Sequence, residues 1–236
     1  MKNSTKEIIN EINTYRDESK AAFLPRFFKT GKGEYGEGDQ FIGVVVPNLR
    51  IVAKKHFDAD FDTFRELLAS PYHEYRLTAL LALTYRYAKL KDHTSRETCV
   101  NFYVSQVDAI NNWDLVDLSC YKILGHWLFD KDKQLLYDWA KENHLWKQRI
   151  AMISCMHFVK QGEFKDALAI ADLLQHHPHD LIHKAVGWIL REIGKEDEQL
   201  LIDYLTPRYK EMPRTMLRYA IERFEEGKRK TFLNSM

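Results

Sequence analysis

The chain has 236 residues, of which 45% are hydrophobic and 29% are charged, and its formal net charge is only +1. This length and composition predict a folded protein with a large core, and they exclude an intrinsically disordered chain. The near-neutral charge does not by itself indicate a nucleic-acid binder, although it hides any asymmetry between faces. No apolar run approaches membrane-spanning length and no signal peptide is evident, so we expect no membrane association and a cytoplasmic location.

The first predicted helix follows Ser4, which forms a capping-box pattern with Glu7 ahead of apolar residues at helical spacing. A glycine-rich loop is predicted at about residues 30–40. Its Gly31-x-Gly33-x-x-Gly36 pattern lacks the strand and following helix of a dinucleotide-binding turn, and two glutamates there would repel phosphate. We therefore expect a flexible loop, in which Lys29, Lys32 and Tyr35 are the candidates for contacts with a ligand.

Residues 41–46 have β-propensity, but no partner strand is nearby and no sheet is predicted. From Phe61 onward the apolar spacing is helical almost throughout. Short breaks separate the helices at Ser70-Pro71, Lys91-Asp92, Asn111-Asn112, Asp130-Lys131, Asn143-His144, Gln161-Gly162, His177-Pro178, Gly194-Lys195, Pro207 and Met212-Pro213.

These breaks arrange the helices in pairs, and the second helix of each pair begins with a charged residue followed by apolar ones. The pairs recur at intervals of roughly 41, 32, 35 and 30 residues. Such an irregular period predicts an all-α fold, a HEAT-like or armadillo-like helical-repeat solenoid, formed by residues 1–236 as a single domain. The leading charges would then line a concave basic face, in the order Arg76, Asp117, Arg149, Lys184 and Arg214.

Asp117 is the one acid in this row and lies in an apolar helical pattern, where a carboxylate is costly unless it is paired, hydrated or used. It follows Trp113 by four residues, which places both on one helix face, and Asp114 between them suits a helix start. One interpretation is a salt bridge from Asp117 to Arg149 of the next repeat. The other is a catalytic carboxylate beside an aromatic wall.

A second tryptophan, Trp188, lies at a related depth two repeats later and follows Gly187, a costly residue inside a helix that suggests the close approach of another group. Trp188 is either a core residue or part of a site. Two aromatic rings, one carboxylate and a row of cations suit a polyanion that develops a transient positive charge. Cleavage of a glycosidic bond through an oxocarbenium-like transition state produces such a charge.

The remaining candidates for chemistry are cysteines and histidines. The thiols are predicted to be small buried hydrophobes in a reducing compartment, because their number is odd and no CxxC motif occurs. The histidines beside Pro178 are predicted to be surface residues of a turn, so no metal and no cofactor are expected. These residues are Cys99, Cys120, Cys155, His176, His177 and His179.

Four segments, in order, resemble the AlkD-type DNA alkylation repair proteins, which are HEAT-like-repeat DNA glycosylases of bacteria. The resemblance covers roughly residues 40 to 226. The segments are Asn112-Trp113-Asp114-Leu115-Val116-Asp117, Trp146-Lys147-Gln148-Arg149-Ile150-Ala151, Lys184-Ala185-Val186-Gly187-Trp188-Ile189-Leu190-Arg191-Glu192 and Pro213-Arg214-Thr215-Met216-Leu217-Arg218-Tyr219-Ala220.

The resemblance implies an enzyme that hydrolyses the N-glycosidic bond of positively charged purines such as 3-methyladenine and 7-methylguanine, in base excision repair. It assigns the catalytic carboxylate to Asp117, the site tryptophans to Trp113 and Trp188, and an arginine near the lesion backbone to Arg149. It also implies that damaged double-stranded DNA is held by its backbone, without a base-sized pocket. We expect further phosphate contacts from Arg76, Lys184, Arg214 and Arg218.

The partner expected from this assignment is alkylated double-stranded DNA, with the protein acting as a monomer and without an obligate protein partner. The competing hypothesis is a non-catalytic HEAT-repeat scaffold that binds DNA or protein. A scaffold has no need to keep Trp113, Asp117, Arg149 and Trp188 together, which is the feature that separates the two hypotheses.

Overall fold

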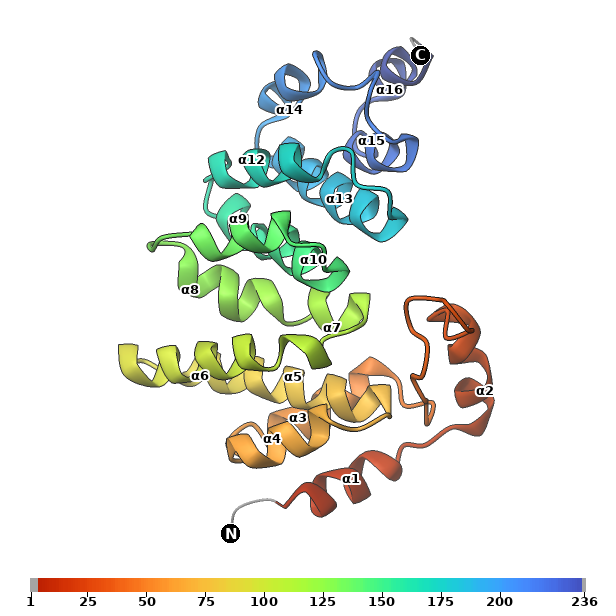
Figure 1. Cartoon of the computed structure of the whole chain (residues 1–236), viewed down its shortest axis with the longest axis vertical. Helices are drawn as coiled ribbons and strands as arrows, with labels where there is room; N and C mark the ends of the chain where they lie inside the picture. The colour runs from red at the N-terminus through yellow and green to blue at the C-terminus, as the bar shows by residue number, and fades with distance from the viewer. Residues whose placement is uncertain (1–3, 235–236) are drawn as a thin grey trace. The chain divides into compact units, whose positions relative to one another are not determined.

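The computed structural model describes residues 4–234, and within them the regular structure is helical (Figure 1). The β-type pairing in this part of the chain is an isolated bridge between Gln40 and Tyr72. The predicted all-α class is therefore confirmed, as is the expectation that residues 41–46 form no sheet. The chain divides into two compact units, residues 1–123 and residues 124–236. A single repeat domain over the whole chain remains a prediction.

The first unit is built around α5, whose residues from His73 to Thr84 are buried on every side. Helices α3, α4, α6 and α7 all pack on α5, and α1 packs on α3 and α4. The helices of this unit are α1 (Thr5–Asn13), α2 (Glu18–Phe27), α3 (Val46–Lys55), α4 (Phe61–Leu68), α5 (His73–Lys89), α6 (His93–Ser105), the 3-10 turn η1 (Val107–Ala109) and α7 (Trp113–Asp117).

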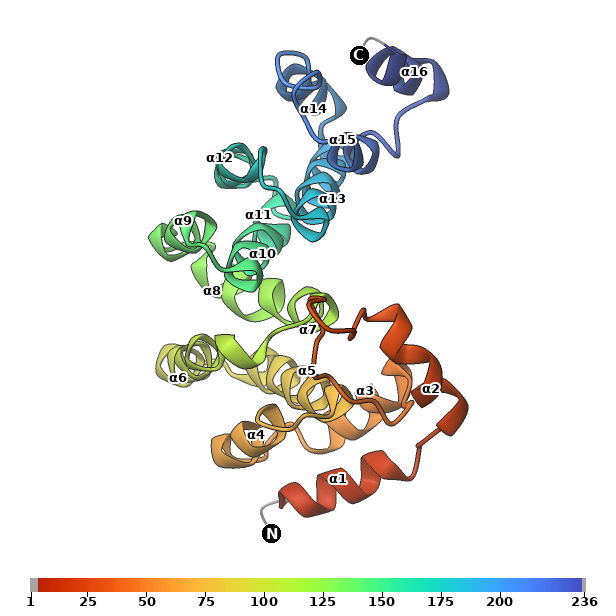
Figure 2. The same cartoon turned by 45° about the vertical axis from the view of Figure 1, so that its right-hand side comes forward.

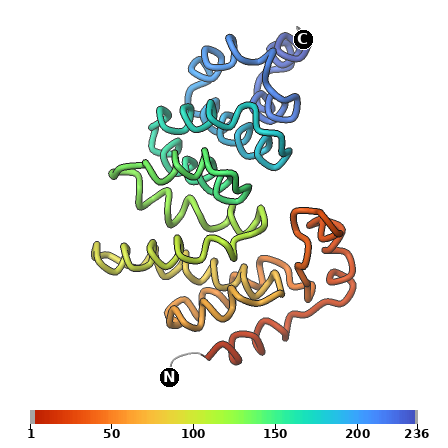
Figure 3. The backbone as a smooth tube through the Cα atoms, viewed as in Figure 1, coloured from red at the N-terminus to blue at the C-terminus, as the bar shows by residue number. Residues whose placement is uncertain are grey.

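Local sequence explains where these helices begin. Ser4 and Glu7 form the predicted capping box at the start of α1. Aspartate side chains accept backbone N–H groups at the starts of α2, α4 and α6. The glycine-rich segment between α2 and α3 forms turns, with positive φ at Gly33 and Gly38, and Figure 3 shows its irregular trace. Glycine adopts positive φ angles at little cost, whereas residues with a Cβ rarely do.

The second unit stacks its helices in two layers, and Figure 2 shows them from a second direction. Helices α10, α13 and α15 pack against one another in chain order, while α9 packs on α10, and α12 and α14 pack on α13. The elements are α8 (His126–Leu128), α9 (Gln134–Lys141), α10 (Leu145–Ser154), α11 (Met156–Val159), α12 (Lys165–Leu174), α13 (Asp180–Glu196), α14 (Glu198–Leu205), α15 (Arg214–Ala220) and α16 (Glu226–Asn234). A π-helical turn, η2 (Tyr121–Gly125), precedes α8.

This layering confirms the helical-pair architecture. Four of the predicted leading charges lie within the first five residues of their helices, namely Arg76, Arg149, Lys184 and Arg214. The prediction is wrong for Asp117, which is the last residue of α7. The break predicted at Gly194-Lys195 is wrong, because α13 continues to Glu196. Gly194 serves packing instead: a Cβ there would lie 2.4 Å from the Leu201 side chain of α14. None of the helices in residues 4–234 is both long and apolar enough to span a membrane.

Gly187 is the point of closest approach between α13 and α15. A Cβ at this position would lie 2.5 Å from the Met216 carbonyl oxygen and 2.5 Å from the Tyr219 Cβ. Both are backbone or backbone-adjacent atoms, which cannot move without shifting the helix. The close approach predicted from a glycine in mid-helix is therefore confirmed, and its partner is the backbone of α15.

We expect Gly187→Ala to lower the free energy of unfolding by about 1–3 kcal/mol, because overpacking between the helices exceeds the gain in helix propensity. Urea denaturation measures the change. The matched control is Gly227→Ala in α16, where the added Cβ meets only the end of the Glu225 side chain. Equal free energies of unfolding for the Gly187→Ala variant and the wild-type protein would contradict this expectation, because they would show that α15 shifts to accommodate the added methyl group without loss of stability.

Candidate functional site

The segment that carries the predicted tryptophan and acid forms the short helix α7. Asn112 caps it by accepting the Trp113 N–H at 2.8 Å, and Leu115 and Val116 are fully buried. Asp117 ends the helix and is half-buried, whereas Asp114 is only 5% exposed. The acid that this helix buries deeply is therefore Asp114, and Asp117 keeps some access to water.

Asp114 belongs to a buried cluster of four charged side chains. His73 Nε2 lies 2.9 Å from Asp114 Oδ2, and His73 Nδ1 lies 3.4 Å from Asp39 Oδ2. Arg76 Nη2 donates to Asp39 Oδ1 at 2.6 Å, and the Asn112 side-chain amide donates to Asp39 Oδ2 at 3.1 Å. Because the two carboxylates lie on opposite ring nitrogens of His73, they do not converge on a point that a metal could occupy.

Burial alone would lower the pKa of His73, but the charge of Asp114 and the hydrogen bonds to Asp114 and Asp39 outweigh it and raise that pKa to about 9. Burial likewise raises the pKa of the Asp39 carboxyl, and the hydrogen bonds from His73, Arg76 and Asn112 reverse the effect and leave the pKa lowered. The geometry and the raised pKa of His73 together place a protonated imidazole between two carboxyl groups at neutral pH.

The neighbouring residue Glu74 fixes the chain that follows the glycine-rich loop. Its Oε1 accepts the backbone N–H groups of Ile42, Gly43 and Val44 at 3.1, 2.8 and 3.3 Å. Burial raises the pKa of Glu74, and these hydrogen bonds oppose that rise. The first turn of α5 thus anchors both the loop and the start of α7.

Trp113 lies at the edge of an aromatic group that reaches the surface. Its ring stacks on Phe28 with centroids 5.3 Å apart and meets Phe27 edge-on at 5.8 Å. Phe28 in turn packs on His73 at 4.7 Å. Phe27 is 52% exposed, so the group presents an aromatic surface beside α7. Figures 1 and 2 both show the loop after α2 beside α7.

The glutamates of the glycine-rich loop are exposed and accept hydrogen bonds from the loop's own backbone. Glu34 accepts the Gly31 N–H at 2.8 Å, and Glu37 accepts the Gly33 N–H at 2.8 Å. Both carboxylates remain exposed, so the repulsion of phosphate expected from these glutamates stays a prediction. Three exposed cations near the loop form no ion pair with any residue of the described chain: Arg26, Lys29 and Lys32.

Arg76 and Arg149 are both predicted phosphate ligands, and the structure gives both an internal partner. Arg76 is 6% exposed and pairs with Asp39, and Arg149 is 4% exposed and donates to the Leu181 carbonyl. A guanidinium buried in this way already uses part of its donor capacity inside the fold. Contacts of these two residues with DNA remain predictions.

The other predicted residues of the second unit are more accessible. Lys184 and Trp188 are half-buried on α13, and Lys184 pairs with Asp180 at 2.6 Å. Arg214 is exposed and donates to the Leu233 carbonyl at 3.0 Å. Arg218 is exposed and forms no ion pair within residues 4–234. Arg218 is therefore the predicted phosphate ligand in this unit that is best placed to bind a phosphate.

The predicted residues thus fall into two groups, one in each unit. Trp113, Asp117 and Arg76 belong to the first unit, where the buried cluster links the helices that carry them. Trp188 and the other cations belong to the second unit. That both groups act on one stretch of DNA remains a prediction.

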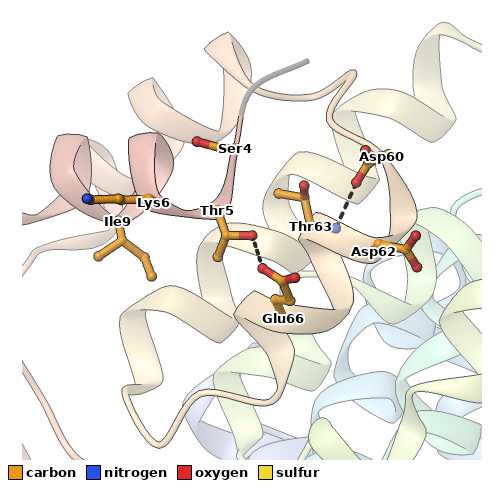
Figure 4. A pocket seen from close by; sticks show the side chains of 8 residues that line it. All are labelled: Ser4, Thr5, Lys6, Ile9, Asp60, Asp62, Thr63 and Glu66. Atoms are coloured by element: carbon orange, nitrogen blue, oxygen red, sulfur yellow. Dashed lines mark hydrogen bonds between the residues drawn. The ribbon is translucent and has the colours of Figure 1, made fainter.

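A cavity of about 660 Å³ lies between α1 and α4 and contains neither Trp113 nor Asp117 (Figure 4). Asp60, Asp62 and Glu66 line it, and Asp60 accepts the Thr63 N–H at 2.8 Å. This acidic lining would repel a phosphate backbone. Within the described residues, no cluster of three or more histidine, cysteine, aspartate or glutamate side chains has the grouping that a metal ion requires.

The family model of the DNA alkylation repair enzymes matches residues 8–224. The chain belongs to this family. A solved structure described as a predicted DNA alkylation repair enzyme from Enterococcus faecalis has a similar fold, with a TM-score of 0.68 over 89% of this chain and 97% of that chain, at 13% identity. No curated protein matches the sequence. The family resemblance predicted from the four segments is thus confirmed, and it assigns the chain a role in DNA alkylation repair.

Sequence patterns did not reveal His73, Asp39 or Phe28 as parts of this site. Asp39 and His73 precede Asp114 by 75 and 41 residues, and no periodicity connects positions so far apart. The available signal was weak: a histidine, a glutamate and an arginine lie within four residues, directly before the apolar run Leu77–Leu83. Polar residues there need buried partners, so an interior cluster could have been suspected.

The raised pKa of His73 predicts a specific pH dependence of stability. A histidine whose pKa is about 9 in the folded state and about 6.5 in the unfolded state stabilises the fold fully below pH 6.5. That contribution, about 3 kcal/mol at most, is lost as the pH rises through 9. We expect the free energy of unfolding, measured with urea between pH 6.5 and pH 9.5, to fall more steeply for the wild-type protein than for His73→Gln. Parallel pH profiles would contradict the assignment.

Proposed function

We propose that this protein is a monofunctional DNA glycosylase that excises positively charged alkylated purines, such as 3-methyladenine and 7-methylguanine, from double-stranded DNA. The observation that carries the proposal is that Trp113 and the half-buried Asp117 lie four residues apart on one anchored helix, in a member of the alkylation repair family. The proposal includes action as a monomer, without a cofactor and without an obligate protein partner.

The chemistry that this assignment requires is modest. Alkylation at N3 or N7 gives the base a positive charge and weakens its bond to deoxyribose, so the protein supplies only part of the barrier, at about 1.4 kcal/mol for each tenfold in rate. Asp117 would stabilise the sugar cation as it forms and orient or deprotonate the attacking water. A carboxylate with access to solvent suits both roles.

The aromatic and basic residues would act on the sugar and the backbone. Trp113 and Trp188 would pack against deoxyribose and stabilise its developing charge through their ring faces. Phosphates would be held by cations, of which Arg218, Lys29 and Lys32 form no ion pair within the described chain. Four further cations remain candidates, because their internal contacts do not use all of their N–H donors: Arg149, Arg76, Lys184 and Arg214.

We expect Asp117→Asn to slow the release of 7-methylguanine by at least about 100-fold, because the amide cannot balance a positive charge on the sugar. Single-turnover excision from a methylated duplex measures the effect, and fluorescence anisotropy with the same duplex should show binding within about threefold of the wild-type protein. The matched control is Asp203→Asn, an exposed acid of α14 whose loss should change neither quantity.

Excision by Asp117→Asn at the wild-type rate would remove Asp117 from catalysis. Absence of excision by the wild-type protein, with methylated purines and with measurable DNA binding, would favour the non-catalytic scaffold. The two results are distinguishable, because in the first both the wild-type protein and Asp117→Asn excise the base, and in the second the wild-type protein does not.

We expect Arg218→Ala to weaken DNA binding about uniformly across sequences and to reduce the slope of log K against log salt concentration by about 0.9, the value for one phosphate contact. Arg208→Ala is the matched control, because Arg208 is occupied by Asp172 at 2.9 Å. Binding titrations at several salt concentrations give both slopes. An unchanged slope for Arg218→Ala would place Arg218 outside the interface.

A further inference from the structure

The buried cluster connects the start of α7 to two other segments of the first unit. Asp114 lies one residue after Trp113 and three before Asp117, and its carboxylate is bound by His73 of α5. The cap residue Asn112 is bound to Asp39 at the end of the glycine-rich loop. Two polar side chains of one helical turn are therefore anchored to the same pair of residues, His73 and Asp39.

A helix as short as α7 does not fix its own orientation. Five residues close too few hydrogen bonds to offset the entropy of ordering them, so tertiary contacts must determine where the helix points. Leu115 and Val116 supply apolar contact, which is non-directional. The hydrogen bonds of Asn112 and Asp114 are directional and determine the rotation of the helix about its axis, and with it the directions of Trp113 and Asp117.

His73 is suited to join two carboxylates. Both of its ring nitrogens face an oxygen, and both can donate only when the ring carries two protons. The charged groups around it are Asp114 from α7, Asp39 from the loop, and Arg76 and Glu74 from its own helix. A neutral ring would leave one carboxylate without its donor and would leave excess negative charge in the interior.

The arrangement is poorly explained by stability alone. Buried ion pairs often stabilise a fold no more than apolar residues of the same volume. This cluster also leaves Asp114 Oδ1 and Arg76 Nε without a hydrogen-bond partner in the structure. What such a cluster provides instead is one defined geometry, because each charge tolerates few alternative positions.

We propose that His73 and Asp114 are positioning residues that set the orientation of α7 and thereby align Asp117 and Trp113 with the lesion sugar. The inference rests on the proposed glycosylase function. Neither residue touches the DNA, and both act through Asp117. A displacement of about 1 Å at a reacting group can cost about 100-fold in rate, which sets the scale of the expected effect.

The test is Asp114→Asn, which keeps the shape of the side chain and removes its charge. We expect single-turnover excision of 7-methylguanine to slow by about 10- to 100-fold, with affinity for the duplex within about threefold of the wild-type protein. Adding Asp114→Asn to Asp117→Asn should cause no further loss, because a positioning residue has nothing left to position. Independent losses that multiply would overturn the proposal.

The matched control is Glu11→Gln, which breaks another histidine–carboxylate pair in the same unit. Glu11 Oε2 lies 2.7 Å from His56 Nε2, and neither residue is on α5 or α7. This variant should excise at the wild-type rate. An equal loss in Glu11→Gln would show that any weakened pair slows the enzyme, and it would overturn the proposal.

Should Asp114→Asn fail to fold, the wild-type protein provides the measurement. The excision rate should fall with rising pH along the same curve as the deprotonation of His73, followed by NMR of its ring. A rate that does not follow this titration overturns the positioning role. The proposed function fails separately, if Asp117→Asn excises at the wild-type rate while Asp114→Asn does not.

Discussion

The first unit depends on the burial of polar groups in the first turn of α5. His73, Glu74 and Arg76 lie where an apolar helix would be simplest to pack, and each is 6% exposed or less. Burying such groups is costly unless every one finds a partner. Here the partners are Asp114, the backbone of residues 42–44 and Asp39, so the cost of burial is offset only when the loop and α7 are both in place. Folding of the loop and orientation of α7 are thereby coupled.

The same accounting separates the net charge of the chain, which is +1, from the charges that its surface exposes. Several acids are occupied inside the first unit: Asp39 and Asp114 by His73 and Arg76, and Glu74 by backbone amides. The loop glutamates are turned onto their own backbone. Buried and paired charges of either sign contribute little field outside the protein, whereas exposed charges, the loop glutamates included, contribute more. Net charge is thus a poor guide to the potential that DNA would meet.

The sequence was sufficient to predict the helical class, the helix pairs and most helix boundaries, because each depends on local spacing and capping. Gly187 could also be interpreted from its position alone, since a glycine in mid-helix needs a packing reason. The break at Gly194 was wrong for the same reason: a glycine near a helix end can mark either a terminus or a contact, and only the approach of Leu201 distinguishes them. The anchoring of Asp114 could not be predicted, because its partners are 41 and more residues away.

The two acids of α7 show what local spacing indicates and what it leaves open, because spacing does not tell which of them the fold buries. A carboxylate in an apolar pattern suggests a costly, functional group, and that argument was applied to Asp117. In the structure the cost of burial falls on Asp114, and Asp117 is only half-buried. On the proposed mechanism this division is reasonable, since the acid that meets a sugar cation and a water molecule needs solvent access, while the acid that fixes geometry needs the interior. Because Asp114 and Asp117 lie three residues apart on one short helix, the contacts that hold Asp114 in the core also determine the position of Asp117.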